Sequence, residues 1–141
     1  MQFDYRKEPD RTKPKKQWIK RPKIQVELHN GSKHVQLICL VDSGADDCMF
    51  HSSIADVLGI DLKTGTHKPF GGIAKGIVID SYLHPIEIQI QGFAERIPVV
   101  AAFCESSAVD GILGQSGFFE NYKVEFEGYR GRLSISSRPT P

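Results

Sequence analysis

The chain has 141 residues, of which 40% are hydrophobic and 25% are charged, which suits one compact domain with a core and no more than one. No apolar stretch approaches the roughly 20 residues of a membrane span, and the first residues lack the apolar core of a secretory signal, so we expect a soluble cytoplasmic protein. The net charge of +1 hides an asymmetry, because residues 1–23 hold nine Lys or Arg against three acids and residues 24–141 hold nine against fourteen.

Residues 1–21 mix charge and proline without periodicity, as expected of a segment too polar to bury itself. We expect a flexible basic arm here, a folded domain over residues 22–137 and a short tail over residues 138–141. The Lys and Arg of the arm could attract nucleic acid phosphates, but the arm holds no folded RNA-binding motif. A solvated tail is therefore favoured, and nucleic acid would be a partner only through this arm.

A β-hairpin is expected after the arm. From Ile24, the segment IQVELH alternates apolar and polar residues, Asn30 and Gly31 are typical of a type I′ turn, and SKHVQLICLVD returns. Every residue from Leu37 to Val41 is apolar, which predicts a strand covered on both faces. Asp42 then lies at the end of a central strand.

The rest of the chain is expected to form short strands with few helices. SSIADVLGID predicts a short helix that Ser53 caps, with Asp56 as the capping-box acid and Gly59 as the end. Alternating strands follow, and GFFENYK predicts a second brief helix. Strands of this spacing favour a mainly β fold, a closed or nearly closed β-barrel rather than a parallel sheet.

Asp42 is the strongest candidate for a chemical role. A buried strand precedes it, the Ser43 hydroxyl lies beside it, and Gly44 lacks a side chain, so that another backbone segment can approach closely. A carboxylate at this place would be oriented and partly desolvated. The triplet alone is a weak signal, because Asp, Ser and Gly are also the commonest turn residues.

The order of the elements strengthens this interpretation. An apolar strand, DSGA, a capped helix, the glycine-rich FGGIAKG, alternating strands and the apolar GILG follow one another, and this order resembles the retropepsin-like aspartic protease family. The resemblance runs from about Ile24 to Ile135 and is strongest at LVDSGADD, which looks like the catalytic loop of retroviral proteases with Ser in the commoner Thr place. It implies a β-barrel of the acid-protease type, equal to one half of a pepsin.

The resemblance also implies a homodimer with one catalytic Asp42 from each chain. Two carboxylates a few ångströms apart share a proton, so one acts as base towards a bound water and the other as acid. Ser43, Gly44 and Ala45 would support the catalytic loop, with the Ser43 hydroxyl tying the two loops together across the dimer. This chemistry needs no metal, no cofactor and no covalent intermediate.

Two further acids follow in the same motif. Asp46 and Asp47 match positions that meet the substrate backbone in retroviral members, although an ordinary solvated acidic loop would look the same. Retroviral members carry an Arg that pairs with the first of these acids, and Gln115 stands in its place. Asp46 therefore lacks its usual partner.

The remaining substrate contacts are expected from two glycine-containing segments. FGGIAKG corresponds to the flap that closes over bound peptide, with Gly71, Gly72 and Ile73 against the substrate; a plain glycine loop is the simpler alternative. Ile112 and Leu113 of GILG would pack beneath the active site and line its pockets.

Other chemistry has weaker support in the sequence. Cys39, Cys48 and Cys104 are odd in number and form no CxxC pair, which predicts reduced core residues rather than a disulfide or metal site. A Cys48 and His51 nucleophile pair lacks an oxyanion motif. The histidines do not have the spacing of a metal site.

The leading hypothesis is a homodimeric aspartic endopeptidase acting on a peptide or protein substrate. One alternative is a domain that keeps the groove but binds peptides or proteins without cutting them. Another makes the basic arm the functional part, with the barrel as a scaffold on nucleic acid.

Overall fold

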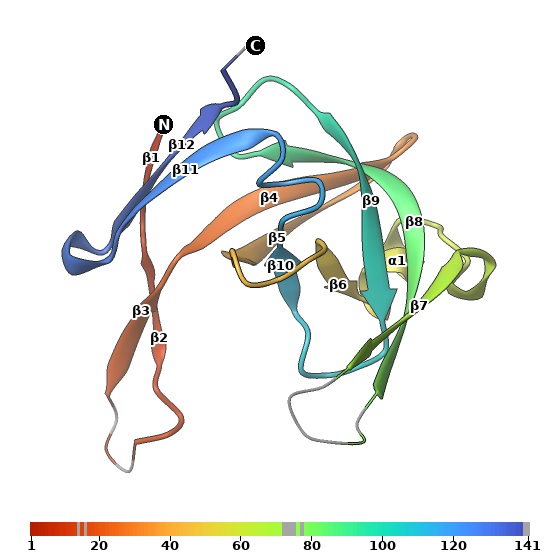
Figure 1. Cartoon of the computed structure of the whole chain (residues 1–141), viewed down its shortest axis with the longest axis horizontal. Helices are drawn as coiled ribbons and strands as arrows, with labels where there is room; N and C mark the ends of the chain where they lie inside the picture. The colour runs from red at the N-terminus through yellow and green to blue at the C-terminus, as the bar shows by residue number, and fades with distance from the viewer. Residues whose placement is uncertain (14, 16, 72–75, 77, 140–141) are drawn as a thin grey trace.

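The computed structural model describes the chain except for residues 14, 16, 72–75, 77 and 140–141. Within the described residues, the largest unit is a seven-stranded sheet in the order β4, β5, β10, β6, β9, β8, β7, and β4 pairs again with β8, so that the sheet is ring-like (Figure 1). Its strands are β4 (Lys23–Asn30), β5 (Lys33–Val41), β6 (Met49–His51), β7 (Thr66–Gly71), β8 (Val78–Ile90), β9 (Ile97–Cys104) and β10 (Gly111–Leu113). The predicted mainly β fold is confirmed.

The inside of the ring is filled by alternate residues of its strands. Val26 of β4 pairs with Ile90 of β8, and Leu28 pairs with Ile88; all four are almost fully buried. Each such side chain contributes about 1.5 to 3 kcal/mol by leaving water. The period-two pattern of the sequence therefore fixes which face of β4 and β8 forms the core.

β5 also alternates, and the prediction that both its faces are covered is wrong. Cys39 and Val41 point into the core, whereas Leu40 is half-buried and Ile38 keeps 38% of its surface exposed. Apolar composition from Leu37 to Val41 does not distinguish a strand between two layers from one whose outer side lines a groove. The outer side of β5 faces such a groove.

The turn between β4 and β5 differs in detail from the expected one. Asn30 pairs with Lys33, so the two turn residues are Gly31 and Ser32. Gly31 has φ of 61°, and Ser32 has no positive φ. Glycine alone at the first turn position is typical of a type II′ hairpin rather than type I′.

The helices are short. α1 (Ser52–Val57) begins after His51, whose Nδ1 accepts a hydrogen bond from the Ser53 N–H. The prediction of Ser53 as the cap is therefore wrong. Gly59 ends the helix as expected, with φ of 68°. The 3-10 turns η1 (Leu62–Thr64) and η2 (Gly128–Arg130) are the other helical segments of the described chain. The second helix, predicted from GFFENYK, is a series of turns, because the Phe119 N–H bonds five residues back to Gly114.

The N-terminal residues form strands, whereas the sequence predicted a flexible arm. β1 (Gln2–Asp4) pairs with β12 (Arg132–Ser137), which also pairs with β11 (Tyr122–Glu127), and β2 (Arg6–Pro9) forms a hairpin with β3 (Trp18–Arg21). Glu8 supports the hairpin through Arg21 at 2.6 Å and Lys23 at 2.7 Å. A two-stranded ribbon with both faces in water need not alternate apolar and polar residues, so the charge pattern concealed it. The division at residue 21 stays a prediction.

Candidate active site

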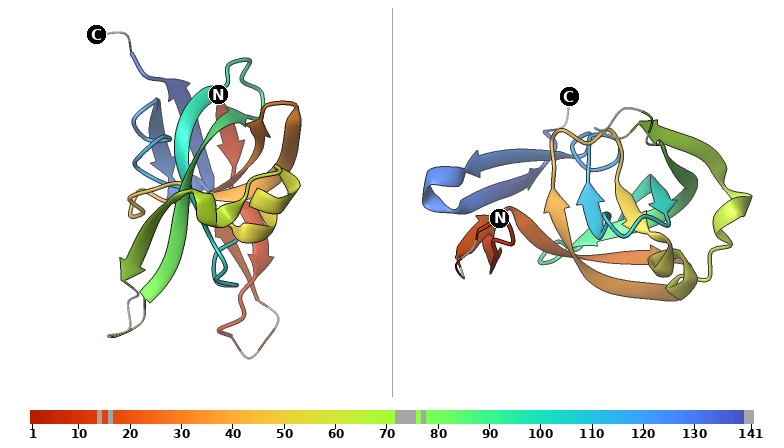
Figure 2. Two further views of the ribbon diagram at one scale, coloured as in Figure 1. Left: turned by 90° about the vertical axis from the view of Figure 1, so that its right-hand side faces the viewer. Right: turned by 90° about the horizontal axis from the view of Figure 1, so that it is seen from below.

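Asp42 follows β5 at the point where β10 runs alongside. The two strands are parallel with Val41 opposite Leu113, and the Asp42 N–H donates to the Leu113 carbonyl at 3.0 Å. Seen from below, β10 lies between β5 and β6, and the loops after β5 and β10 lie at the same end (Figure 2, right). The strands thus fix the backbone of Asp42, while the residue itself stays half-buried rather than enclosed.

A tight turn orients the Asp42 carboxylate. The Gly44 N–H donates to Asp42 Oδ1 at 2.9 Å, and the Ala45 N–H donates to the Asp42 carbonyl at 3.2 Å. A Cβ at residue 44 would lie 3.2 Å from Oδ1, which is tight for such a contact. The close approach predicted at Gly44 is therefore made by the Asp42 side chain, not by another backbone segment, and it holds one carboxylate oxygen in place.

The loop after β10 supports the Asp42 loop, by which we mean residues 42–47. The Gln115 N–H donates to the Ala45 carbonyl at 2.8 Å, and the Ser116 N–H donates to the Asp46 carbonyl at 2.8 Å. The Gln115 side chain donates from Nε2 to the Ser43 carbonyl at 2.7 Å. From the sequence, Gln115 was seen only as a departure from Arg, and this supporting role was missed. The one signal for it was the side-chain amide, which can donate to a backbone carbonyl.

Asp46 and Asp47, which looked alike in the sequence, occupy different environments. Asp46 is exposed. Asp47 is buried, and its Oδ2 accepts a hydrogen bond from Lys68 Nζ of β7 at 2.5 Å; the same ammonium lies 5.3 Å from the centre of the Phe70 ring. Asp47 thus links the Asp42 loop to β7, and contact of either acid with substrate stays a prediction.

Replacing Lys68 with Met should destabilise the fold. The Asp47 side chain keeps only 10% of its surface exposed, so loss of the ammonium leaves a buried acceptor without its partner, at a cost of about 1 to 3 kcal/mol in the free energy of unfolding. Urea unfolding measures this cost. Lys123→Met is the matched control, because its partner Glu125 is 63% exposed and the pair is worth less than about 1 kcal/mol. Equal losses for both variants would contradict a structural role for the Asp47 pair.

Ile112 and Leu113, both predicted to line substrate pockets, point to opposite sides of β10. Leu113 is fully buried in the core, so its predicted substrate contact is corrected to a packing role. Ile112 is half-buried and pairs with Leu40. Ile38, Leu40 and Ile112 line a groove of about 420 Å³, whose charged rim holds Glu8, Arg21, Lys23 and Asp110.

Solved structures resemble this chain, although no family model and no curated protein matches its sequence. A retropepsin-like aspartic protease from Rickettsia conorii superposes with a TM-score of 0.60 at 15% sequence identity, over 81% of this chain and 89% of that one. The chain has the retropepsin-like fold. EIAV protease complexed with the inhibitor HBY-793 is also similar, with a TM-score of 0.47 at 22% identity over 67% of this chain and 81% of that one. So is the retroviral protease-like domain of Ddi1 from Leishmania major, with a TM-score of 0.43 at 22% identity over 65% of this chain and 71% of that one.

In this retropepsin-like fold, the hairpin of β7 and β8 carries the segment that was predicted to be the flap. Gly71 ends β7, is exposed and pairs with Val78. Gly72 and Ile73 lie outside the described residues. Contact of these three residues with a peptide therefore stays a prediction.

The cysteines are core residues, as predicted. Cys39, Cys48 and Cys104 are free and fully buried, and burial raises the pKa of the Cys48 thiol to about 11. A thiol with this pKa stays protonated at neutral pH and is a poor nucleophile. Cys48 Sγ donates to the Ser116 carbonyl at 3.5 Å, and His51 Nδ1 lies 2.9 Å from the Ser53 hydroxyl, so the two side chains of the predicted nucleophile pair bond other partners.

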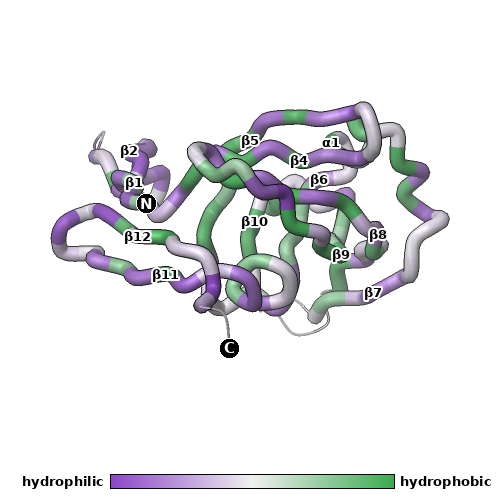
Figure 3. The backbone as a smooth tube through the Cα atoms, turned by 90° about the horizontal axis from the view of Figure 1, so that it is seen from above, coloured by the Kyte–Doolittle hydropathy of each residue, from purple (hydrophilic) through white to green (hydrophobic). Residues whose placement is uncertain are grey.

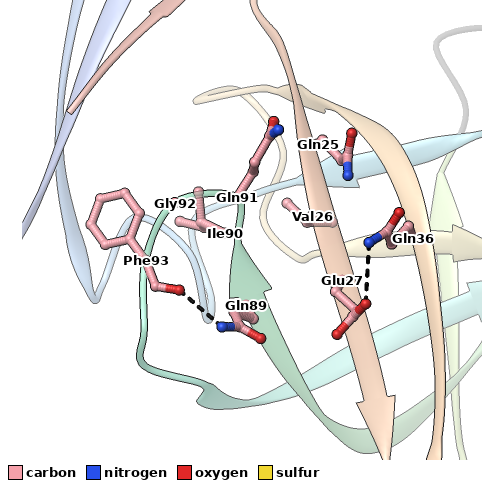
Figure 4. Close-up of a pocket in the computed structure, with 9 residues that line it drawn as sticks. All are labelled: Gln25, Val26, Glu27, Gln36, Gln89, Ile90, Gln91, Gly92 and Phe93. Carbon is pink, nitrogen blue, oxygen red and sulfur yellow. Dashed lines mark hydrogen bonds between the residues drawn. The ribbon is translucent and has the colours of Figure 1, made fainter.

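Another pocket lies apart from the groove of Ile38, Leu40 and Ile112. The pocket in Figure 4 lies among β4, β5 and the turn after β8 and is lined by Gln25, Val26, Glu27, Gln36, Gln89, Ile90, Gln91, Gly92 and Phe93. Gln89 Nε2 already donates to the Phe93 carbonyl at 2.9 Å, and Gln36 Nε2 donates to Glu27 Oε2 at 3.4 Å. None of the predicted site residues lines this pocket.

The described residues contain no group of three or more His, Cys, Asp or Glu that could hold a metal ion. In the same part of the chain, no helix has the length and apolar character needed to cross a membrane.

Proposed function

We propose that the chain is an aspartic endopeptidase that works as a homodimer, with Asp42 of both protomers in one active site. The observation that carries the proposal is the Asp42 carboxylate at the end of β5, held by the Gly44 N–H at 2.9 Å, in a chain with the retropepsin-like fold. One carboxylate supplies only half of the acid–base pair. The second comes from a second copy of the chain.

The two Asp42 carboxylates share one proton, because like charges a few ångströms apart do not both ionise easily. The ionised carboxylate takes a proton from a water molecule that attacks the peptide carbonyl. The protonated carboxyl donates a hydrogen bond to the carbonyl oxygen, and the leaving nitrogen is then protonated. The Gly44 N–H keeps one oxygen of each carboxylate in position throughout.

Ser43 supports the proposed dimer. It is exposed, and its carbonyl is held by the Gln115 side chain. The backbone is therefore fixed, while the hydroxyl is available to bond the partner loop. Gly44 and Ala45 complete the support of Asp42 within each chain.

The proposed place for the peptide substrate is the groove of Ile38, Leu40 and Ile112, in which Leu40 precedes Asp42 by two residues at the end of β5. Its apolar floor favours an apolar side chain next to the bond that is cut. Asp46 is exposed on the Asp42 loop and is proposed to meet the peptide backbone. The free cysteines agree with a reducing compartment such as the cytoplasm.

Mixing wild-type and Asp42→Asn chains tests this proposal. Equal amounts are unfolded together and refolded, so that random pairing leaves about one quarter of the dimers with two Asp42 carboxylates. Cleavage of an internally quenched peptide library should then fall to about one quarter of the wild-type rate at the same total concentration. An enzyme whose active site lies within one chain would keep about one half of the wild-type rate. The ratio of the two rates therefore distinguishes a shared active site from a site within one chain.

A result of one half would contradict the shared active site. A wild-type dimer that binds library peptides without producing new termini, between acidic and neutral pH, would instead support the alternative of a binding domain on the same fold.

A further inference from the structure

The hairpin of β2 and β3 projects from the ring (Figure 1) and carries a large share of the positive charge of the chain. Its turn adds the exposed cations Arg11, Lys13 and Lys15. The residues of β2 are mostly hydrophilic, as the purple colour of this strand in Figure 3 shows. Only Glu8 and Arg21 of this hairpin line the groove proposed for the peptide, and the proposed acid–base chemistry at Asp42 uses none of its residues.

One face of the hairpin is basic and aromatic. Lys7 lies opposite Lys20 and Pro9 opposite Trp18, and paired residues of an antiparallel ribbon share a face. All four are exposed, Trp18 by 65%. These four residues are called the basic face below.

The acids of the hairpin lie on its other side. Glu8 and Asp10 occupy the alternate positions and line a pocket together with Ile19, and Glu8 bonds Arg21 and Lys23 there. Because successive residues of a strand point to opposite faces, these acids do not neutralise the basic face.

The tip of the hairpin of β11 and β12 extends the basic face. The Tyr5 N–H donates to the Gly131 carbonyl at 2.7 Å, and a Cβ at Gly131 would lie 3.4 Å from Lys20 Cδ, so Lys20 lies against this tip. The tip carries Tyr129, which is 82% exposed, and the Arg130 guanidinium 5.3 Å from the centre of the Tyr129 ring. Segments more than 100 residues apart in the chain thus lie side by side, and Glu127 is the acid of the tip, 3.6 Å from Arg130 and 3.2 Å from Arg132.

We propose that the basic face binds single-stranded nucleic acid, with phosphates at Lys7 and Lys20 and bases stacked on Trp18 and Tyr129. Cations along a ribbon attract the phosphates of a backbone without reading its sequence. Exposed aromatic rings stack with unpaired bases of any kind. The bases of a duplex are already stacked on one another, so the exposed rings favour single strands.

An anionic membrane is the competing partner of a basic surface with a tryptophan. Membrane binding needs several apolar side chains that enter the acyl region together. Trp18 lies among lysines on the basic face, and the apolar Ile19 is half-buried on the other side. The arrangement therefore favours nucleic acid.

Trp18 itself reports the test, because the chain has a single tryptophan. Adding unlabelled oligothymidylate of about 20 nucleotides to the full chain should quench the Trp18 fluorescence, and a duplex of the same length should bind more weakly. Trp18→Ala should weaken binding about tenfold by anisotropy of a labelled oligonucleotide. Lys7→Gln with Lys20→Gln should lower the slope of log affinity against log salt by about 1.4, because each contact with a single-stranded phosphate contributes about 0.7.

Lys63→Gln with Lys123→Gln removes the same charge from exposed lysines outside the basic face and should leave both the affinity and the slope unchanged. Equal losses for the two double variants, or binding without quenching of Trp18, would overturn the proposal. Tighter binding to phosphatidylserine vesicles than to oligothymidylate, lost with the same residues, would overturn it in favour of a membrane. Asp42→Asn should bind oligonucleotide like the wild type, so the result does not depend on the proposed peptidase activity.

Discussion

Asp42→Asn should reduce the rate of peptide cleavage at least a thousandfold, because one acid or base contributes a factor of about 10² to 10⁴ and both members of the pair are lost. Asn has the shape of Asp, and its side-chain oxygen can accept the Gly44 N–H that Asp42 Oδ1 accepts at 2.9 Å. The fold and the dimer should therefore persist. What disappears is the group that can take a proton from water.

The measurement is cleavage of an internally quenched peptide, together with the melting temperature and the sedimentation of each protein. Asp56→Asn on α1 is the matched control, since Asp56 is exposed and lies outside the proposed site; it should cleave at the wild-type rate. An Asp42→Asn protein that is folded and cleaves like the Asp56→Asn protein would refute the proposed mechanism. A loss of both activity and melting temperature would show that Asp42 acts on stability instead.

The position of Asp42 could be predicted because its signals are local. An apolar strand before it and a glycine two residues later both appear in the sequence, and the structure places them as a strand end and a tight turn. The alternation of β4 and β8 was also readable, since a period of two assigns alternate residues to the core. Element type and the core of the ring follow from such short-range patterns.

Other features depend on distant residues and left little local trace. The separation of Asp46 from Asp47 arises because Lys68 of β7 reaches only the second, and no pattern near residue 46 indicates this. The β2 and β3 hairpin carries charge on both faces, so its sequence has no alternation of apolar and polar residues from which strands could be predicted. His51 rather than Ser53 caps α1, because the chain passes directly from β6 into the helix, two residues before the cap that the usual preference for Ser suggests.

The support of the Asp42 loop by the loop after β10 depends on one glycine. At Gly114 an added Cβ would lie 2.3 Å from the Asp47 carbonyl oxygen and 2.7 Å from the Ala45 carbonyl oxygen. Both neighbours are backbone atoms, which cannot turn aside as a flexible side chain can. The close approach also sets the 2.8 Å bond from the Gln115 N–H to the Ala45 carbonyl.

Gly114→Ala should therefore lower the free energy of unfolding by about 3 kcal/mol or more, at the upper end of the cost of overpacking. It should also abolish peptide cleavage, because the Asp42 loop must move for the methyl group to fit. Urea unfolding measures the first effect and the quenched-peptide assay the second. Gly128→Ala is the matched control: the nearest atom to its added Cβ is Tyr5 Oη at 4.0 Å, an ordinary contact, so its stability should change by less than about 1 kcal/mol. If the two alanine variants unfold at the same urea concentration, the two loops do not pack as closely as the structure has them. If Gly114→Ala is destabilised but still cleaves at the wild-type rate, the loop after β10 stabilises the fold without positioning Asp42.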